Sequence, residues 1–389
     1  MKQSGTYQEP HYRYDISLLR KTLKKAKAAA EVHATELYYA VKANNEAVIL
    51  KEIQQMGLGA DCVSMEEIER ALQIGFPAER IVFAGSGKTI REIDYATAQN
   101  IAVIHCESVE EFDIIQEFLE SNNSTTKVAL RINPDLEAGT HSRISTGKKH
   151  HKFGMPWEDA MELISIHKNI VGFHFHIGSQ ILDMTYFENL SSRIAELLLS
   201  TPLDFKTEYL NMGGGLGIDY EDPIKNNIAD FEGWMSAIRK NLPKRTYPVI
   251  RLEPGRSIVG QCGMLVGQVQ YVKHRETCPT AILDIGMTDL LRPMLYGARH
   301  KITTVIDSLT LIPQTIAGPS CESTDVFGKN YYLPELNRGD IVRVHSAGAY
   351  GSSMRLGYNL KSPIKAMYIY SESKTTFNAN YKERTKVAV

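Results

Sequence analysis

The sequence predicts an α/β protein, a (β/α)8 TIM barrel followed by a C-terminal β-rich domain. From residue 35, eight short apolar runs alternate with amphipathic stretches over about 220 residues, the size of such a barrel. The stretches between the runs are long enough for crossover helices, which indicates parallel strands. After residue 260 the pattern changes to strands joined by turns, with little helix.

Each predicted barrel strand is a short run rich in apolar residues and bounded by turn signals. In chain order the runs cover residues 37–43, 59–63, 81–85, 101–106, 127–133, 170–178, 207–214 and 247–254. Between them, stretches such as "EEIERALQIGF" and "VEEFDIIQEFLES" show helical spacing of apolar residues, often after a Ser, Thr or Asn. An open doubly wound sheet is the main alternative, although eight parallel strands are many for one.

After the barrel, the residue pattern predicts strands within "GMLVGQVQYVKHR", "PTAILDIGM", "YYLPELNRGDIVRVHSAGAYG" and "KAMYIYSES". We therefore expect three parts. They are an N-terminal segment, 1–30, that packs with the β domain, a barrel, 31–260, and a β-rich domain, 261–389.

Composition limits the partners of the protein. The 389 residues carry a formal net charge of -1, which argues against nucleic acid or an anionic membrane as the main partner. No run of eighteen apolar residues occurs, and the N-terminus lacks the apolar core of a signal peptide. Five cysteines without C-x-x-C spacing suit a reducing cytoplasm. We expect a cytoplasmic protein that acts on a small molecule.

The segment "IVFAGSGKTI" (81–90) looks like a nucleotide-binding P-loop, but the pattern requires a glycine where Val82 stands. A β-branched residue cannot make the turn of that leading glycine. The favoured interpretation is a strand, a glycine-rich turn and a helix capped near Thr89.

Polar residues gather where the predicted strands end, which is where such barrels carry their chemistry. Lys42 ends the first strand, and partial desolvation there would make its amine a better nucleophile. The glycine run 213–215 follows strand seven, the usual place for a phosphate site. Glu253 and Arg256 flank a Pro-Gly turn after strand eight, and both can point into the barrel mouth.

An H-x-H pair, His174 and His176, ends strand six and is expected on one face of it. Such a pair can bind zinc, but no convincing set of further ligands accompanies it in the sequence. We therefore predict no metal site, and an imidazole lying flat on a planar cofactor is the alternative.

The chain resembles the fold-type III pyridoxal-phosphate decarboxylases, the alanine racemase-like barrels, over nearly its whole length. Among them it is similar to the diaminopimelate decarboxylase family. The resemblance rests on long, ordered motifs: "YAVKAN" (39–44), "HIGSQ" (176–180), "GGGLG" (213–217), "EPGR" (253–256), "RPMLYGARH" (292–300), "GPSCESTDVF" (318–327) and "AGAYG" (347–351).

The resemblance implies pyridoxal 5'-phosphate as cofactor and a role for each matching residue. Lys42 should hold the cofactor as a Schiff base, and Cys321 should donate a proton to the product carbon. The remaining cofactor contacts implied are His176 stacked on the ring, Ser179, Gly213, Gly214 and Gly215 at the phosphate, Glu253 at the pyridine nitrogen, and Pro254, Gly255, Arg256 and Tyr350. The substrate contacts implied are Arg256, Arg292, Tyr296, Glu322 and Tyr350. Because Cys321 and Glu322 come from the partner subunit in this family, a homodimer is expected.

The expected reaction is decarboxylation of meso-2,6-diaminopimelate to L-lysine and CO2. Guanidinium groups at Arg256 and Arg292 suit a carboxylate, and Glu322 suits an ammonium group, so together they match a distal amino-acid head. A decarboxylase of carboxynorspermidine, ornithine or lysine is the alternative nearest in chemistry. A non-catalytic pyridoxal-phosphate-binding protein and a metal-dependent amidohydrolase are more distant alternatives.

The sequence departs from the family pattern at "YNLKSP", where an Arg expected after Tyr358 and Asn359 is absent. The segment 136–154 resembles the family's active-site loop, and its His150 and His151 are assigned no role.

Overall fold

The computed structural model of the chain describes residues 9–136, 152–244, 246–247, 249–274, 278–306 and 308–370. Two compact units make up the chain. One comprises 22–217 and 229–258, and the other comprises 1–21, 218–228 and 259–389. His150 and His151, with most of the 136–154 segment, lie outside the described residues.

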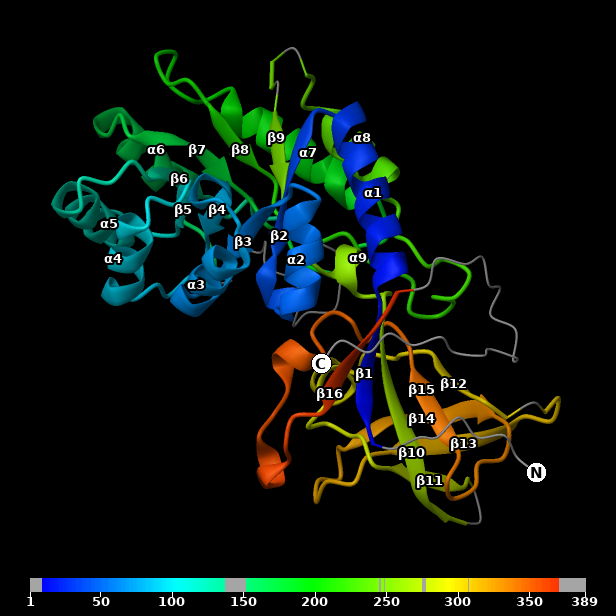
Figure 1. Cartoon of the computed structure of the whole chain (residues 1–389). Helices are drawn as coiled ribbons and strands as arrows, with labels where there is room; N and C mark the ends of the chain where they lie inside the picture. The colour runs from blue at the N-terminus through cyan, green and yellow to red at the C-terminus, as the bar shows by residue number, and fades with distance from the viewer. Residues whose placement is uncertain are drawn as a thin grey trace. The chain divides into compact units, whose positions relative to one another are not determined.

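The first unit is a closed barrel of eight parallel strands in the order β2 to β9, which confirms the predicted barrel and excludes the open sheet. The helices lie outside the strands (Figure 1). The strands are β2 (Thr35–Ala40), β3 (Gly59–Cys62), β4 (Ile81–Phe83), β5 (Val103–Cys106), β6 (Lys127–Arg131), β7 (Ile170–His174), β8 (Tyr209–Asn211) and β9 (Ile250–Leu252). The helices are α1 (Ile16–Val32), α2 (Ala47–Gln55), α3 (Met65–Ile74), α4 (Ile90–Ala98), α5 (Val109–Ser121), α6 (Trp157–Ile166), α7 (Thr185–Leu198), α8 (Phe231–Arg239) and α9 (Arg256–Val259).

Side-chain caps explain where several barrel helices begin. Ser64 and Ser108 accept hydrogen bonds from the amides of Glu67 and Glu111 and start α3 and α5. Thr89 starts α4 with a full capping box, as the sequence predicted for this position. These caps fix the helix starts directly after the strand-end turns, and so they fix the turns that carry the polar residues.

Strand β7 requires a glycine. A Cβ on Gly172, whose φ is +152°, would lie 1.9 Å from the Tyr209 carbonyl oxygen of the paired strand β8. The predicted strand 170–178 was too long, because β7 ends at His174. His174 and His176 therefore do not extend one strand face, and they make different contacts.

The second unit is a mixed β-sheet domain. Its main path has the order β12-β15-β10-β11-β13-β14, and β1 pairs with β10 and β16. The strands are β1 (His11–Asp15), β10 (Gly263–Lys273), β11 (Thr280–Leu283), β12 (Ile302–Thr304), β13 (Ile312–Ala317), β14 (Val326–Leu333), β15 (Ile341–Val344) and β16 (Lys365–Ile369). Its one short α-helix among the described residues after 260 is α10 (Arg292–Tyr296). The predicted β-rich second part is confirmed.

Within the described residues, no helix combines the length and the apolar character needed to cross a bilayer.

Candidate active site

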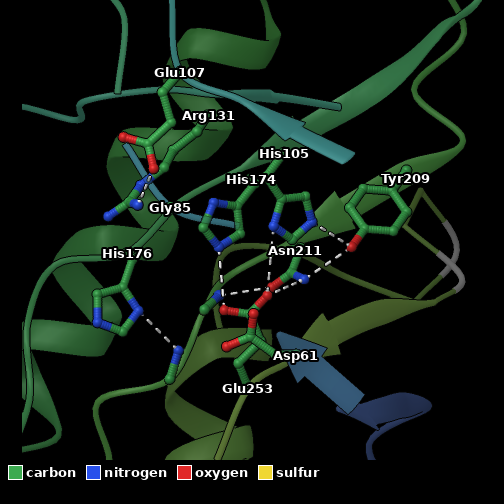
Figure 2. Close-up of polar contacts among 12 residues, drawn as sticks. Asp61, Gly85, His105, Glu107, Arg131, His174, His176, Tyr209, Asn211 and Glu253 are labelled. Carbon is green, nitrogen blue, oxygen red and sulfur yellow. Dashed lines mark hydrogen bonds and ion pairs between the residues drawn. The ribbon is translucent and has the colours of Figure 1, made fainter. Parts of the chain in front are cut away.

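Glu253 follows β9 directly, and two strand-end side chains bind its carboxylate inside the barrel. Asn211 Nδ2, at the end of β8, lies 2.7 Å from Oε1, and His174 Nε2, at the end of β7, lies 3.2 Å from Oε2 (Figure 2). His105 of β5 stacks on His174 with ring centroids 4.0 Å apart, and its Nε2 lies 2.8 Å from the Tyr209 hydroxyl. All five side chains are buried, so the carboxylate has one fixed orientation.

The charges in this cluster follow from burial. Desolvation lowers the pKa of both His105 and His174 well below the ordinary value, so both imidazoles are neutral. A neutral His174 can still donate Nε2–H to the Glu253 carboxylate. Burial raises the pKa of Glu253, while Lys42 and Asn211 act in the opposite direction. A buried carboxylate of this kind favours a cationic N–H partner, because an opposite charge offsets its desolvation.

Lys42 lies in a single 3-10 turn, Val41–Ala43, immediately after β2. The predicted strand extended through Lys42, whereas β2 ends at Ala40. The Nζ atom lies 3.4 Å from Oδ2 of Asp61 in the neighbouring strand β3. The Lys42 side chain is 38% exposed while that of Asp61 is fully buried, so the amine is accessible and its neighbour is not.

Burial raises the pKa of Asp61 to about 7; the Glu253 charge adds to this rise, and Lys42 opposes it. Desolvation also raises the pKa of Glu67 to about 7, although the Val63 amide donates to its carboxylate. The amine at the end of β2 therefore lies beside a carboxyl group that can gain or lose a proton near neutral pH.

The lysine of the P-loop-like segment has a structural role. Lys88 Nζ lies 2.8 Å from the Gly85 carbonyl, 2.6 Å from the His105 carbonyl and 2.8 Å from Glu111 Oε1. Its side chain is only 1% exposed. An ammonium group with three oxygen acceptors has used its donors, so it is not arranged to reach a nucleotide phosphate.

Arg131 at the end of β6 forms a buried ion pair with Glu107, with Nη1 2.5 Å from Oε1. The other oxygen of Glu107 accepts from the Gly154 amide at 3.1 Å. Both oxygens of Glu107 therefore have a donor, and the Gly154 contact fixes the chain where it returns to the barrel after residue 152.

The glycine triplet packs tightly against both neighbouring strand ends and is not a flexible turn. A Cβ on Gly213, at φ +68°, would lie 2.4 Å from the Phe175 carbonyl, and one on Gly214 would lie 2.3 Å from the Glu253 carbonyl. The Gly214 amide donates to His176 Nδ1 at 3.2 Å (Figure 2). This contact makes Nδ1 the acceptor and fixes the ring orientation of His176.

Arg256 and Ser179 of the barrel unit are joined by hydrogen bonds. Arg256 Nη2 donates to Ser179 Oγ at 2.9 Å, and Nε lies 3.4 Å from the same oxygen. Arg256 is the first residue of α9 and is buried. A guanidinium and a hydroxyl at this position form a donor set suited to phosphate or carboxylate.

A metal-binding alternative can be examined geometrically. Among the described residues, His105, His174 and Glu253 offer ligand atoms within 4.8 Å of one another. These are not the H-x-H pair of the sequence. His174 and His105 already contact Glu253 and Tyr209, and we interpret the three as a hydrogen-bonded support for the carboxylate.

Apart from Arg256, the expected substrate residues lie in the β-rich unit. Arg292 begins α10 and is buried, and Tyr296 ends that helix. Cys321 and Glu322 are exposed, and the Tyr358 hydroxyl donates to Glu322 Oε1 at 2.8 Å. This contact raises the pKa of Tyr358. Tyr350 has a left-handed backbone, with φ +56°.

Sequence reasoning missed Asp61, Asn211 and Tyr209. Each stands in an apolar strand run, "GADCV" or "EYLNMGG", where a polar side chain has no reason to be unless it has a buried partner. That placement was the available signal for all three.

Residues 17–260 match the family described as pyridoxal-dependent decarboxylase, pyridoxal binding domain. A protein from Bacteroides thetaiotaomicron named diaminopimelate decarboxylase is 43% identical over 365 residues, which cover 92% of this chain and 94% of that protein. A protein of the same name from Helicobacter pylori strain J99 is 38% identical, covering 92% and 90%.

Solved structures of proteins with the same name have a similar fold. The crystal structure of Helicobacter pylori diaminopimelate decarboxylase complexed with L-lysine has a TM-score of 0.87 and 36% identity, covering 94% of this chain and 92% of that one. The enzyme of the same name from M. jannaschii gives 0.84 at 32% identity, covering 92% and 86%. With the strand-end lysine and the buried glutamate of the barrel, these similarities confirm that the chain belongs to the diaminopimelate decarboxylase family of pyridoxal-phosphate-dependent carboxy-lyases.

Proposed function

We propose that this chain decarboxylates meso-2,6-diaminopimelate to L-lysine and CO2. The observation that carries the proposal is the 43% identity across 92% of the chain to a protein named diaminopimelate decarboxylase. The match to a pyridoxal-dependent decarboxylase family favours a decarboxylase over the amidohydrolase and the non-catalytic pyridoxal-phosphate-binding protein. The other diamino-acid decarboxylases remain the competing assignment and are separated by assay.

The residues of the barrel fit pyridoxal phosphate. The three glycines hold a backbone conformation in which a Cβ would collide with neighbouring carbonyl groups, and Arg256 with Ser179 supplies donors for the phosphate. The buried Glu253 carboxylate suits a protonated pyridine nitrogen. Lys42 presents an accessible amine at the same end of the barrel. His176, with its ring orientation fixed by the Gly214 amide, would lie on the cofactor ring.

When bound through Lys42, pyridoxal phosphate supplies an electron sink for the pair released as the bond to the substrate carboxyl group breaks. Glu253 would hold a positive charge on the ring nitrogen, and Asn211 and His174 would keep that carboxylate in place. Asp61, whose burial raises its pKa to about 7, would accept or return the proton that the Lys42 amine exchanges during substrate binding.

Substrate recognition and protonation would use the β-rich unit. Arg292 and Arg256 would bind carboxylate groups, Tyr296 and Tyr350 would line the substrate, and Glu322 would bind the distal ammonium. Cys321, as an exposed thiol, would deliver the proton that replaces CO2 on the carbon.

The proposal includes a homodimer whose partner subunit contributes Cys321 and Glu322 to each site. Their exposure in the single chain supports this arrangement. A cytoplasmic location also stays part of the proposal, because all five cysteines are free.

The test compares CO2 release from meso-diaminopimelate, ornithine and lysine by the wild type and by Lys42→Ala. We expect the wild type to release CO2 from meso-diaminopimelate alone. Lys42→Ala should lose both turnover and the absorbance at about 420 nm that a lysine–cofactor Schiff base gives. Lys127→Ala is the control, because Lys127 is exposed and begins strand β6, whereas Lys42 follows the last residue of its strand. This variant should retain both turnover and absorbance. Preferred turnover of ornithine or lysine would replace the substrate assignment. Colour and turnover surviving in Lys42→Ala would remove the cofactor role of Lys42.

A further inference from the structure

The β-rich unit holds a buried cluster around Arg292, and two of its members, His300 and Tyr220, have no role in the proposed mechanism. Arg292 Nη1 lies 2.8 Å from Nε2 of His300, and its guanidinium carbon lies 4.7 Å from the centroid of the Tyr220 ring. The Tyr220 and His300 rings meet edge to face, with centroids 4.9 Å apart. Arg292 is 4% exposed and His300 is 1% exposed, so this geometry is protected from water.

The contacts determine the protonation of His300. A guanidinium has only donors, so Nε2 of His300 must be an unprotonated acceptor. Nδ1 lies 2.8 Å from the His345 carbonyl oxygen, which can only accept, so Nδ1 carries the hydrogen. His300 is therefore a neutral imidazole in a single tautomer, bonded through both nitrogens.

The His300 backbone is anchored as well. Its carbonyl accepts from the Tyr331 hydroxyl at 2.9 Å. The neighbouring His345 ring is fixed through Nε2, 2.8 Å from Thr303 Oγ1 of β12. The imidazole is therefore held by the sheet, and its hydrogen bond holds the Arg292 guanidinium in one place. A long arginine side chain without such a contact would sample several rotamers.

We propose that His300 is a positioning residue that orients the Arg292 guanidinium to read the distal carboxylate of the substrate. The inference rests on the proposed function, because Arg292 is assigned to the substrate there. Loss of the His300 contact should therefore weaken the binding of ligands that carry this carboxylate. The binding of ligands that lack the carboxylate should not change. L-Lysine retains the carboxylate of the distal amino-acid head, and 1,5-diaminopentane lacks it.

Two conservative variants separate the two nitrogens of His300. His300→Gln places an amide oxygen where Nε2 stands and can still accept from Arg292. His300→Asn places its amide near Nδ1, so it keeps the contact with the His345 carbonyl and loses the one with Arg292. Both variants remove the ring, and they differ in whether the guanidinium keeps its acceptor.

The experiment uses the holoenzyme and measures dissociation constants of L-lysine and 1,5-diaminopentane from the change in cofactor absorbance, together with KM and kcat. We expect His300→Asn to weaken L-lysine and raise KM about tenfold, the order of one charge-assisted hydrogen bond, with kcat and diaminopentane binding unchanged. His300→Gln should stay within about threefold of the wild type, because it retains that bond. Equal effects of the two variants on L-lysine, or equal weakening of both ligands, would overturn the proposal and leave His300 a structural residue.

Arg292→Gln separates this inference from the function on which it rests. If Arg292→Gln leaves L-lysine binding unchanged, the assignment of Arg292 to the substrate fails, and the inference fails with it. If Arg292→Gln weakens L-lysine and His300→Asn does not, only the inference fails.

Should His300→Asn not fold, the tautomer can be measured in the wild-type holoenzyme by 15N NMR of labelled histidine. The His300 signals are those that disappear in His300→Gln. An unprotonated Nε2 with a protonated Nδ1 supports the arrangement. The opposite tautomer, or a doubly protonated ring, overturns it.

Discussion

Asp61 predicts a specific pH dependence of stability in the barrel unit. Burial raises the pKa of this carboxyl group from its ordinary 3.8 to about 7 in the folded protein. One pKa unit corresponds to about 1.4 kcal/mol, so the full difference is worth about 4 kcal/mol. We propose to measure it with Asp61→Asn, which keeps the size of the side chain and removes its titration.

The sign follows from which state binds the proton. Below pH 3.8 the carboxyl group is protonated in the folded and the unfolded chain, and it has no effect. As the pH rises from 3.8 to about 7, the unfolded chain ionises while folded Asp61 keeps its proton, so the free energy of unfolding falls. Above about 7 the loss is complete. Between pH 5 and 7 the wild type should therefore lose about 2 kcal/mol relative to Asp61→Asn, because folded Asp61 is itself half ionised at pH 7.

The assay is urea denaturation of the cofactor-free protein at pH 5, 6, 7 and 8, followed by tryptophan fluorescence. Both tryptophans, Trp157 and Trp234, belong to the barrel unit, so the signal reports on that unit. The pH-independent cost of the substitution is the same at every pH and cancels in the comparison. Asp113→Asn, an exposed aspartate of α5, controls for the loss of a carboxylate in the same unit.

A difference between wild type and Asp61→Asn that stays constant from pH 5 to 8 would refute the burial argument. So would a difference in which the wild type gains stability as the pH rises, since an ion pair with Lys42 would then outweigh desolvation.

Two further predictions concern the β-rich unit. Because the proposed dimer shares its sites, mixing Lys42→Ala and Cys321→Ala chains, each inactive alone, should restore about a quarter of wild-type turnover after random reassociation; no recovery would mean that each chain supplies both residues itself. The buried carboxylate of Asp325 accepts from the amides of Met287 at 2.7 Å and Ser320 at 2.8 Å, and so it holds the loop that carries Cys321. Asp325→Asn should cost about 2 kcal/mol in chemical denaturation and change the rate of Cys321 alkylation, and an unchanged alkylation rate would show that the loop holds its shape without the carboxylate.

The sequence predicted the barrel because its signal is repeated. Eight apolar runs, each separated from the next by a stretch long enough for a helix, fix the number of parallel strands even where a boundary is displaced by a few residues, as at β2 and β7. It also predicted the strand-end polar residues, because the carboxyl ends of parallel strands meet at one edge. The Lys42, Glu253 and Arg256 positions followed from this rule.

Contacts between strands distant in the chain could not be predicted in the same way. Asn211 and His174 support Glu253 only because β7, β8 and β9 are neighbours in the closed barrel. Nothing in the local pattern around "EYLNMGG" states which acceptor the Asn211 amide will meet. The glycine triplet illustrates the same limit: its place after strand seven predicted a phosphate site, but not that the carbonyl of Glu253 leaves no room for a Cβ at Gly214.

The barrel site contains two buried carboxyl groups, Glu253 and Asp61, that differ in their hydrogen-bond partners. Glu253 receives hydrogen bonds from Asn211 and His174, which stabilise its anion, whereas one oxygen of Asp61, Oδ1, has no hydrogen-bond partner among the described residues. Unequal solvation by the protein separates the proton affinities of neighbouring acids. Glu253 is thereby suited to a lasting charge opposite a ring nitrogen, and Asp61 is suited to a proton that comes and goes beside Lys42. The proposed mechanism uses both properties, and they arise from the neighbours that the closed barrel gives to each strand end.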